Sequence, residues 1–104
     1  MAQIGNPFVA EVPRQMSKEE LVQAIRVDLA GELEAIIGYE AHAQATNDER
    51  AKKVFYHIAD EEKQHVGELQ QLMYMFSPED EISVNKGMQE IQEQQANNFT
   101  QPMQ

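Results

Sequence analysis

Two consecutive long stretches, residues 17–45 and 46–76, repeat their apolar residues every seven positions. In the first stretch, two adjoining lines of residues run along one side, namely Ile25, Glu32, Tyr39 and Val22, Leu29, Ile36, Ala43. In the second stretch, the lines are Phe55, Glu62, Leu69, Phe76 and Ile58, His65, Leu72. A seven-residue repeat places each line on one face of a helix. The chain is therefore predicted to be all-α, with two long helices packed along these lines.

Three helix-start signals predict where the helices begin. Ser17-Lys18-Glu19-Glu20 and Thr46-Asn47-Asp48-Glu49 both have the pattern of a capping box, in which a hydroxyl and a carboxylate bind exposed amides. The second box follows almost directly after the first helix, which is expected to end near Ala45, so the two helices should be antiparallel neighbours. Ser77-Pro78-Glu79-Asp80 predicts a shorter third helix, interrupted or weakened near Gly87.

The chain divides into three parts by composition. Residues 1–16, with two prolines, predict an extended N-terminal arm, and residues 17–95 form the helical domain. From Asn85 onward, Gln and Asn dominate, so this region is expected to lack a core of its own. Disorder is favoured there over a peptide that docks onto another protein. Residues 96–104 are predicted to be a polar, flexible tail.

Composition limits the classes of function. The 104 residues carry a net charge of −10, which argues against binding to nucleic acid or an anionic membrane and suits attraction of cations, although plain solubility explains the charge equally well. No cysteine is present, so thiolate metal sites and disulfides are excluded. No segment has the apolar length of a membrane span, and a cytoplasmic protein is expected. Leu, Ile, Val and Phe number only 23, so help from a partner subunit is expected.

Three ligand-type side chains interrupt the apolar lines: Glu32, Glu62 and His65. Charged groups in a packing seam are costly and need a common explanation. Glu32 lies 15 residues before Asn47 and Glu62 lies 15 residues after it, so an antiparallel hairpin places them at equal depth. Glu62 and His65 are three apart and therefore neighbours on one helix. One Glu-x-x-His pair by itself arises easily by chance, but the three residues together predict a metal site.

The ligand set is half of a known arrangement. Di-iron four-helix bundles use a Glu from each of two helices and a Glu-x-x-His from each of the other two. Two copies of this hairpin related by a two-fold axis would supply that set, so a ferritin-like four-helix bundle and its di-iron centre are predicted to form only on dimerisation. Open positions for dioxygen or peroxide make oxidation of ferrous iron the natural reaction. Zinc or manganese would also fit such ligands.

Other polar and aromatic residues have two interpretations each. Tyr39 lies two turns beyond Glu32, where it would donate a hydrogen bond to a ligand residue or supply an electron, although a core role is more common for an aromatic residue at this spacing. Glu34 and Glu61 point away from the seam and offer an acidic route for entering ferrous ions, or simply a solvated helix face. His42 and His57 are predicted to be surface residues.

The segments Glu32-Leu33-Glu34-Ala35, with Tyr39, and Asp60-Glu61-Glu62-Lys63-Gln64-His65 resemble the encapsulated ferritins, small ferritin-like proteins that work inside encapsulin nanocompartments. The resemblance covers most of residues 14–95. It implies a ferroxidase whose di-iron centre (Fe²⁺/Fe³⁺) lies between two subunits, with Glu32, Glu62 and His65 as ligands and Tyr39 close by. It also implies a homo-oligomer, a ring-like decamer built as a pentamer of dimers, and an encapsulin shell that stores the oxidised iron.

Two departures from the family pattern are visible. Some members have an acidic residue just before the first ligand, where this chain has Gly31, so the entrance for iron at Glu34 differs. Nothing in residues 97–104 matches a typical encapsulin-targeting peptide. The chain would then be a cargo with an unfamiliar tag or part of a longer fusion.

Ferroxidase activity that feeds iron storage in an encapsulin compartment is the leading hypothesis. One alternative is a non-catalytic helical cargo or assembly module in which the same residues bind a metal only to stabilise a dimer. A second alternative is a rubrerythrin-like peroxide reductase, against which the absence of cysteine counts.

Overall fold

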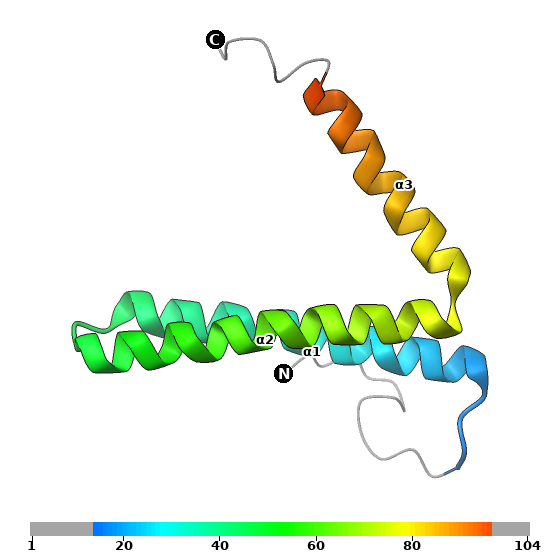
Figure 1. The fold of residues 1–104 in the computed structure, drawn as a ribbon. Helices are drawn as coiled ribbons and strands as arrows, with labels where there is room; N and C mark the ends of the chain where they lie inside the picture. The colour runs from blue at the N-terminus through cyan, green and yellow to red at the C-terminus, as the bar shows by residue number, and fades with distance from the viewer. Residues whose placement is uncertain (1–13, 97–104) are drawn as a thin grey trace.

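The computed structural model describes residues 14–96, which form three helices within that range: α1 Lys18–Ala45, α2 Glu49–Phe76 and α3 Pro78–Gln94. Helices α1 and α2 lie side by side and antiparallel, and α3 turns away from them at the end of α2 (Figure 1). The all-α fold with two long helices and a shorter third is as predicted. Of the described helices, none combines the length and apolar character needed to cross a membrane.

The capping box predicted at Ser17 is present. The Ser17 hydroxyl accepts a hydrogen bond from the Glu20 amide at 3.1 Å, and the Glu20 carboxylate accepts one from the Ser17 amide at 2.9 Å. Arg14 donates two hydrogen bonds to the same carboxylate. These contacts, with the one from Arg14 strongest, lower the pKa of Glu20 to about 2. The start of α1 is thus stabilised by the reciprocal hydrogen bonds of Ser17 and Glu20 and by the charge of Arg14.

The cap of the second long helix was predicted two residues too early, at Thr46. Helix α2 is capped by Asp48, whose carboxylate accepts hydrogen bonds from the amides of Arg50 at 2.9 Å and Ala51 at 3.1 Å. Thr46 instead ends α1, and its hydroxyl accepts a hydrogen bond from the Asp48 amide at 3.2 Å. A carboxylate is a stronger acceptor than a hydroxyl at the positive end of a helix, so Asp48 takes the capping position and Thr46 closes the turn.

The buried core is small and lies mainly where the hairpin is open, near the start of α1 and the end of α2. It consists of Val22, Ile25 and Met73, with Leu21, Leu29, Leu69, Tyr74 and Phe76 packed around them. Between the middle of the hairpin and its loop, Ala43 and Ala59 are fully buried. The line of α2 that holds Ile58, His65 and Leu72 is partly open to solvent in the single chain. Leu72 is 37% exposed and the His65 side chain about half exposed.

Helix α3 runs through Gly87 without a break, so the predicted interruption is wrong. One glycine inside a helix costs only about 1 kcal/mol, which Pro78 in the first turn and three acidic residues at the positive end help to offset. The described residues of α3 include none that is buried, as expected for a segment without a core. Arg26 of α1 holds the first turn of α3 through an ion pair with Asp80 at 2.6 Å.

The helix reaches Gln94, so the disorder favoured from Asn85 onward is wrong for residues 85–94. Most of the arm predicted for residues 1–16 and most of the tail predicted for 96–104 lie outside the described residues. The three-part division of the chain therefore stays a prediction.

Candidate metal centre

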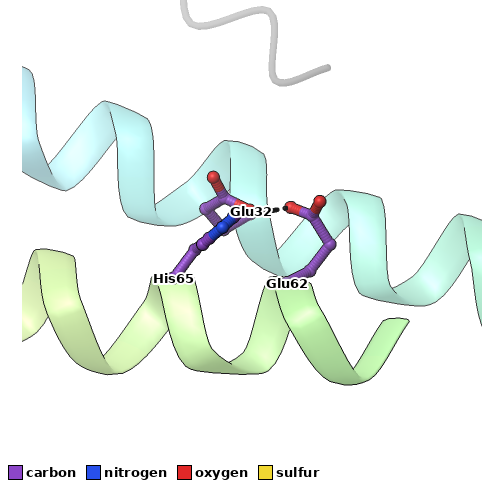
Figure 2. Close-up of side chains that lie close together, drawn as sticks. All are labelled: Glu32, Glu62 and His65. Carbon is purple, nitrogen blue, oxygen red and sulfur yellow. Dashed lines mark ion pairs between the residues drawn. The ribbon is translucent and has the colours of Figure 1, made fainter. Parts of the chain in front are cut away.

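The structure brings together the three ligand-type residues that the sequence singled out. Glu32 projects from the middle of α1, and Glu62 and His65 project from the middle of α2 toward it (Figure 2). His65 Nδ1 lies 3.5 Å from Glu32 Oε2 and 3.6 Å from Glu62 Oε2. One donor atom from each residue falls within 4.8 Å of the other two. A single helical hairpin therefore brings two carboxylates and an imidazole together at one point.

The cluster is electrostatically unsatisfied within the single chain. Glu32 Oε2 is buried and has no hydrogen-bond partner among the described residues, since the imidazole contact is too long for a good hydrogen bond. The neighbouring Glu62 carboxyl group, and then burial, raise the pKa of Glu32. Partial burial of His65 works against its charge, but the attraction of Glu32 and Glu62 outweighs this and raises the pKa of His65. Two facing carboxylates therefore share one imidazole.

The donor set fits a divalent metal ion. A buried carboxylate oxygen without a partner is costly, and a cation at the point where the three donors converge would satisfy it. Carboxylate oxygen and imidazole nitrogen suit ferrous iron, manganese and zinc. Three donors leave several coordination positions to solvent, substrate or a second protein chain. The role of these residues as ligands stays a prediction.

Sequence reasoning missed one contact that holds this region. Lys63, directly after Glu62, reaches across to Glu40 of α1 at 3.0 Å and also lies 3.5 Å from Asp60. Attraction to Glu40 raises the pKa of Lys63. Side chains on a helix lean toward its N-terminus, which explains why Lys63 meets a residue nearer the loop than Glu32. The pair helps to set the register of the two helices beside the ligands.

The other predicted site residues lie outside the cluster. The Tyr39 ring stacks on Phe55 with centroids 6.4 Å apart, as a packing role would require. Glu34 is exposed on α1, beside a shallow hollow that Gly31 and His42 also line.

The two histidines predicted at the surface are both exposed. His42 also packs edge-on against Phe55, with centroids 5.4 Å apart, and His57 pairs with Glu61 at 3.4 Å. Neither histidine approaches the cluster of Glu32, Glu62 and His65.

Comparison with known proteins agrees with this geometry. The crystal structure of the encapsulated ferritin domain from Pyrococcus furiosus superposes with a TM-score of 0.76 at 35% sequence identity, covering 85% of this chain and 90% of that one. This chain belongs to the encapsulated ferritin family. The family model described as ubiquinone biosynthesis protein COQ7 matches residues 19–77, which hold the whole hairpin.

Two curated relatives of this chain have names that refer to encapsulins. The encapsulin nanocompartment cargo protein EncC of Myxococcus xanthus is 42% identical over 74 residues, 71% of this chain and 57% of that protein. The ferritin-like–encapsulin shell fusion protein of Pyrococcus furiosus is 35% identical over 88 residues, 85% of this chain and 26% of that protein. The chain thus spans less than two thirds of the length of these curated relatives.

Proposed function

We propose that this encapsulated ferritin-like protein is a ferroxidase that oxidises ferrous to ferric iron at a centre made by two copies of the chain. The observation that carries the proposal is the convergence of Glu32, Glu62 and His65 within 4.8 Å, with a buried Glu32 oxygen that lacks a hydrogen-bond partner. A site of this composition favours a divalent cation.

The exposure of the site supports a second copy as its missing half. The His65 side chain is 50% exposed, and large apolar side chains on α2 are open on either side of it, with Val54 56% and Leu72 37% exposed. A second hairpin would cover them and contribute another Glu32, Glu62 and His65. Two hairpins then form a four-helix bundle that holds two iron ions, and a pentamer of such dimers is the decamer implied by the family resemblance.

In the proposed reaction the iron ions supply the electrons, and the protein supplies the side chains that bind the ions. Two ferrous ions give up one electron each, and with two protons these electrons reduce dioxygen to hydrogen peroxide, or hydrogen peroxide to two water molecules. The carboxylates of Glu32 and Glu62 balance the positive charge of the ions, which favours the ferric product. The His65 nitrogen adds a neutral donor once its proton has left. Tyr39 is a candidate for a hydrogen bond that orients a ligand side chain.

The names of the relatives support an association with an encapsulin. Their names describe an encapsulin cargo protein and an encapsulin shell fusion. We propose the same partner for this chain, with ferric iron stored inside an encapsulin nanocompartment in the cytoplasm. The acidic balance of the chain and the exposed Glu34 suit the attraction of ferrous ions toward the site.

Stopped-flow oxidation tests the activity. Ferrous iron is added to the metal-free protein without oxygen, air or hydrogen peroxide is then admitted, and ferric absorbance is followed against buffer. Replacing Glu32, Glu62 or His65 by Ala should remove most of the rate enhancement, whereas Asp60→Asn, an exposed change on the same helix, should leave it intact. Iron binding without faster oxidation than in buffer would favour a metal-stabilised assembly module instead. Peroxide consumption that exceeds the iron oxidised would favour a peroxide reductase.

A further inference from the structure

The part of the hairpin that carries the three ligand-type residues is not held by buried apolar side chains. The core cluster lies at the open end of the hairpin, and the two fully buried alanines lie nearer the loop. Between these places, in residues 26–42 of α1 and 60–72 of α2, none of the residues that the structure describes is buried. Glu32 and Glu62 face each other there, and their carboxylates repel when both are charged (Figure 2). Apolar packing alone therefore does not fix the register of the two helices at this level.

An ion pair crosses between the helices at this level. The Lys63 ammonium lies 3.0 Å from a Glu40 carboxylate oxygen, and 3.5 Å from an Asp60 carboxylate oxygen of its own helix. Lys63 directly follows Glu62 in α2. Glu40 lies eight residues after Glu32 in α1, which places it about 12 Å nearer the loop. Because Glu32 and Glu62 meet at one level, the ion pair runs obliquely to the helix axes. Sliding α1 along α2 changes the length of an oblique contact, so this pair opposes such sliding.

The ion pair leaves the ligand cluster accessible. Successive residues of α2 turn by about 100°, so Lys63 and His65 lie on opposite sides of Glu62, about 160° apart around the helix. The His65 side chain is 50% exposed on its own side. Glu40 and Lys63 are outside the group of donors that converge on one point. The pair therefore braces the cluster from the other side without taking a coordination position.

We propose that Lys63 and Glu40 are a positioning pair, which holds α1 and α2 in the register that brings Glu32 up to Glu62 and His65. The proposal rests on the metal centre proposed above, and it assigns to that centre two residues that do not touch the ion. Donors from two helices converge in one register only, since a slide of one residue moves a ligand by about 1.5 Å. A displacement of about 1 Å is enough to loosen a metal site.

Removing each partner in turn separates positioning from a simple effect of charge. Lys63→Met takes away a positive charge and keeps the aliphatic stem, whereas Glu40→Gln takes away a negative charge. If the two residues acted only through their charges, the first change would strengthen the binding of a cation and the second would weaken it. If they position the ligands, both changes weaken binding.

Cobalt binding to the full-length chain measures the effect. Lys63→Met and Glu40→Gln should each lower the affinity for Co²⁺ about two- to fivefold, the range that a partly exposed ion pair supports, because the two side chains are 52% and 35% exposed. Each change should also alter the visible absorption spectrum of bound Co²⁺, which reports the arrangement of the ligands. The double variant should bind no more weakly than the weaker of the two single variants, because the residues act as one pair.

Three further variants serve as controls. Lys63→Arg keeps the charge and the reach, and should retain most of the affinity and the spectrum of the parent. Asp60→Asn removes the partner of Lys63 that lies on the same helix, with the same change of charge as Glu40→Gln, and should bind as the parent does. Lys53→Met removes an exposed cation elsewhere on α2 and should also bind as the parent does.

Equal or tighter Co²⁺ binding by Lys63→Met, with the spectrum of the parent, overturns the positioning role. If circular dichroism shows that Lys63→Met does not fold, the comparison of Glu40→Gln with Asp60→Asn decides, because only the first should weaken binding. A parent protein that binds Co²⁺ without speeding iron oxidation refutes the ferroxidase proposal alone. A parent protein that binds no Co²⁺ refutes the metal centre and the positioning role together.

Discussion

At the scale of single residues, the cluster of Glu32, Glu62 and His65 opposes stability in the free chain. Glu32 keeps a buried oxygen without a partner beside a second carboxylate, and its pKa is raised by that neighbour and by burial. A carboxyl group with a raised pKa in the folded state destabilises the fold as pH rises, because the unfolded chain releases its proton more easily. Functional sites commonly retain such conflicts between binding and stability.

Glu32→Gln should therefore stabilise the metal-free protein while removing its response to metal. We expect a gain of up to about 1 kcal/mol at neutral pH, reduced by the partial exposure of the side chain, and a Tm higher by a few degrees. The gain should shrink at acidic pH, where Glu32 is protonated in both states. Calorimetry in chelator measures the gain, and repeating it with Zn²⁺ measures the lost response. A lower Tm in chelator at neutral pH would contradict the proposed conflict.

The cap at the start of α1 should make stability depend on acid. Glu20 has a pKa of about 2 in the folded chain, well below its ordinary value near 4.5, chiefly through Arg14. Its contribution is therefore complete above about pH 5 and is lost as pH falls toward 2. Arg14→Met should lower the free energy of unfolding at pH 7 and lower it much less at pH 2. Urea unfolding at both values checks this, with Lys53→Met, which removes an exposed cation from α2, as the control.

At the scale of helices, most boundaries could be predicted and the errors have physical reasons. The box at Ser17 and the start at Pro78 were readable because each signal stands alone. At residues 46–49 two candidate caps compete within three positions, and the winner depends on how the backbone turns between α1 and α2. Gly87 looked like a break, but among the described residues no other part of the chain packs against this position and could draw it out of the helix.

The two candidate caps in the loop should differ in their effect on stability. Asp48→Ala removes two capping hydrogen bonds and should lower the free energy of unfolding by about 1 kcal/mol. Thr46→Ala removes only the contact that closes the turn and should cost less than half as much. Asn47→Ala, in the same loop, is the control. Urea titrations followed by circular dichroism give the free energy of unfolding of all three variants. A larger loss for Thr46→Ala than for Asp48→Ala would mean that Thr46, as first predicted, is the cap of α2.

At the scale of the whole molecule, the hairpin is thinly packed and open. Its buried core gathers at one end, while apolar side chains on α1, α2 and α3 stay exposed, among them Leu33, Ile37, Val54, Met75, Ile82 and Ile91. Patches of this kind mark surfaces that other protein covers. Metal binding and assembly should therefore support each other in this protein.

Removing metal should loosen both the fold and the assembly. At a free metal concentration of one hundred times Kd, binding adds about 2.7 kcal/mol per site to the stability of the folded form. We expect chelator to lower Tm and shift native mass spectra toward single chains, and Co²⁺ or Zn²⁺ to reverse both changes. His65→Ala should show neither response. If the mass of the oligomer and its Tm do not change with metal, assembly does not depend on metal binding at this site.

The sequence by itself determined the all-α hairpin, the depth match of Glu32 with Glu62 and the neighbouring His65, because helical periodicity and a tight loop leave few alternatives. Only the tertiary structure decided that Asp48 caps α2, that Lys63 reaches Glu40, and that Glu32 keeps an oxygen without a partner. The cap depends on how the backbone turns between the two helices, and the other two depend on distances between side chains of different helices. The spacing of residues along one helix contains neither. The exposure of His65 also came from the tertiary structure, since one hairpin covers only one side of each helix.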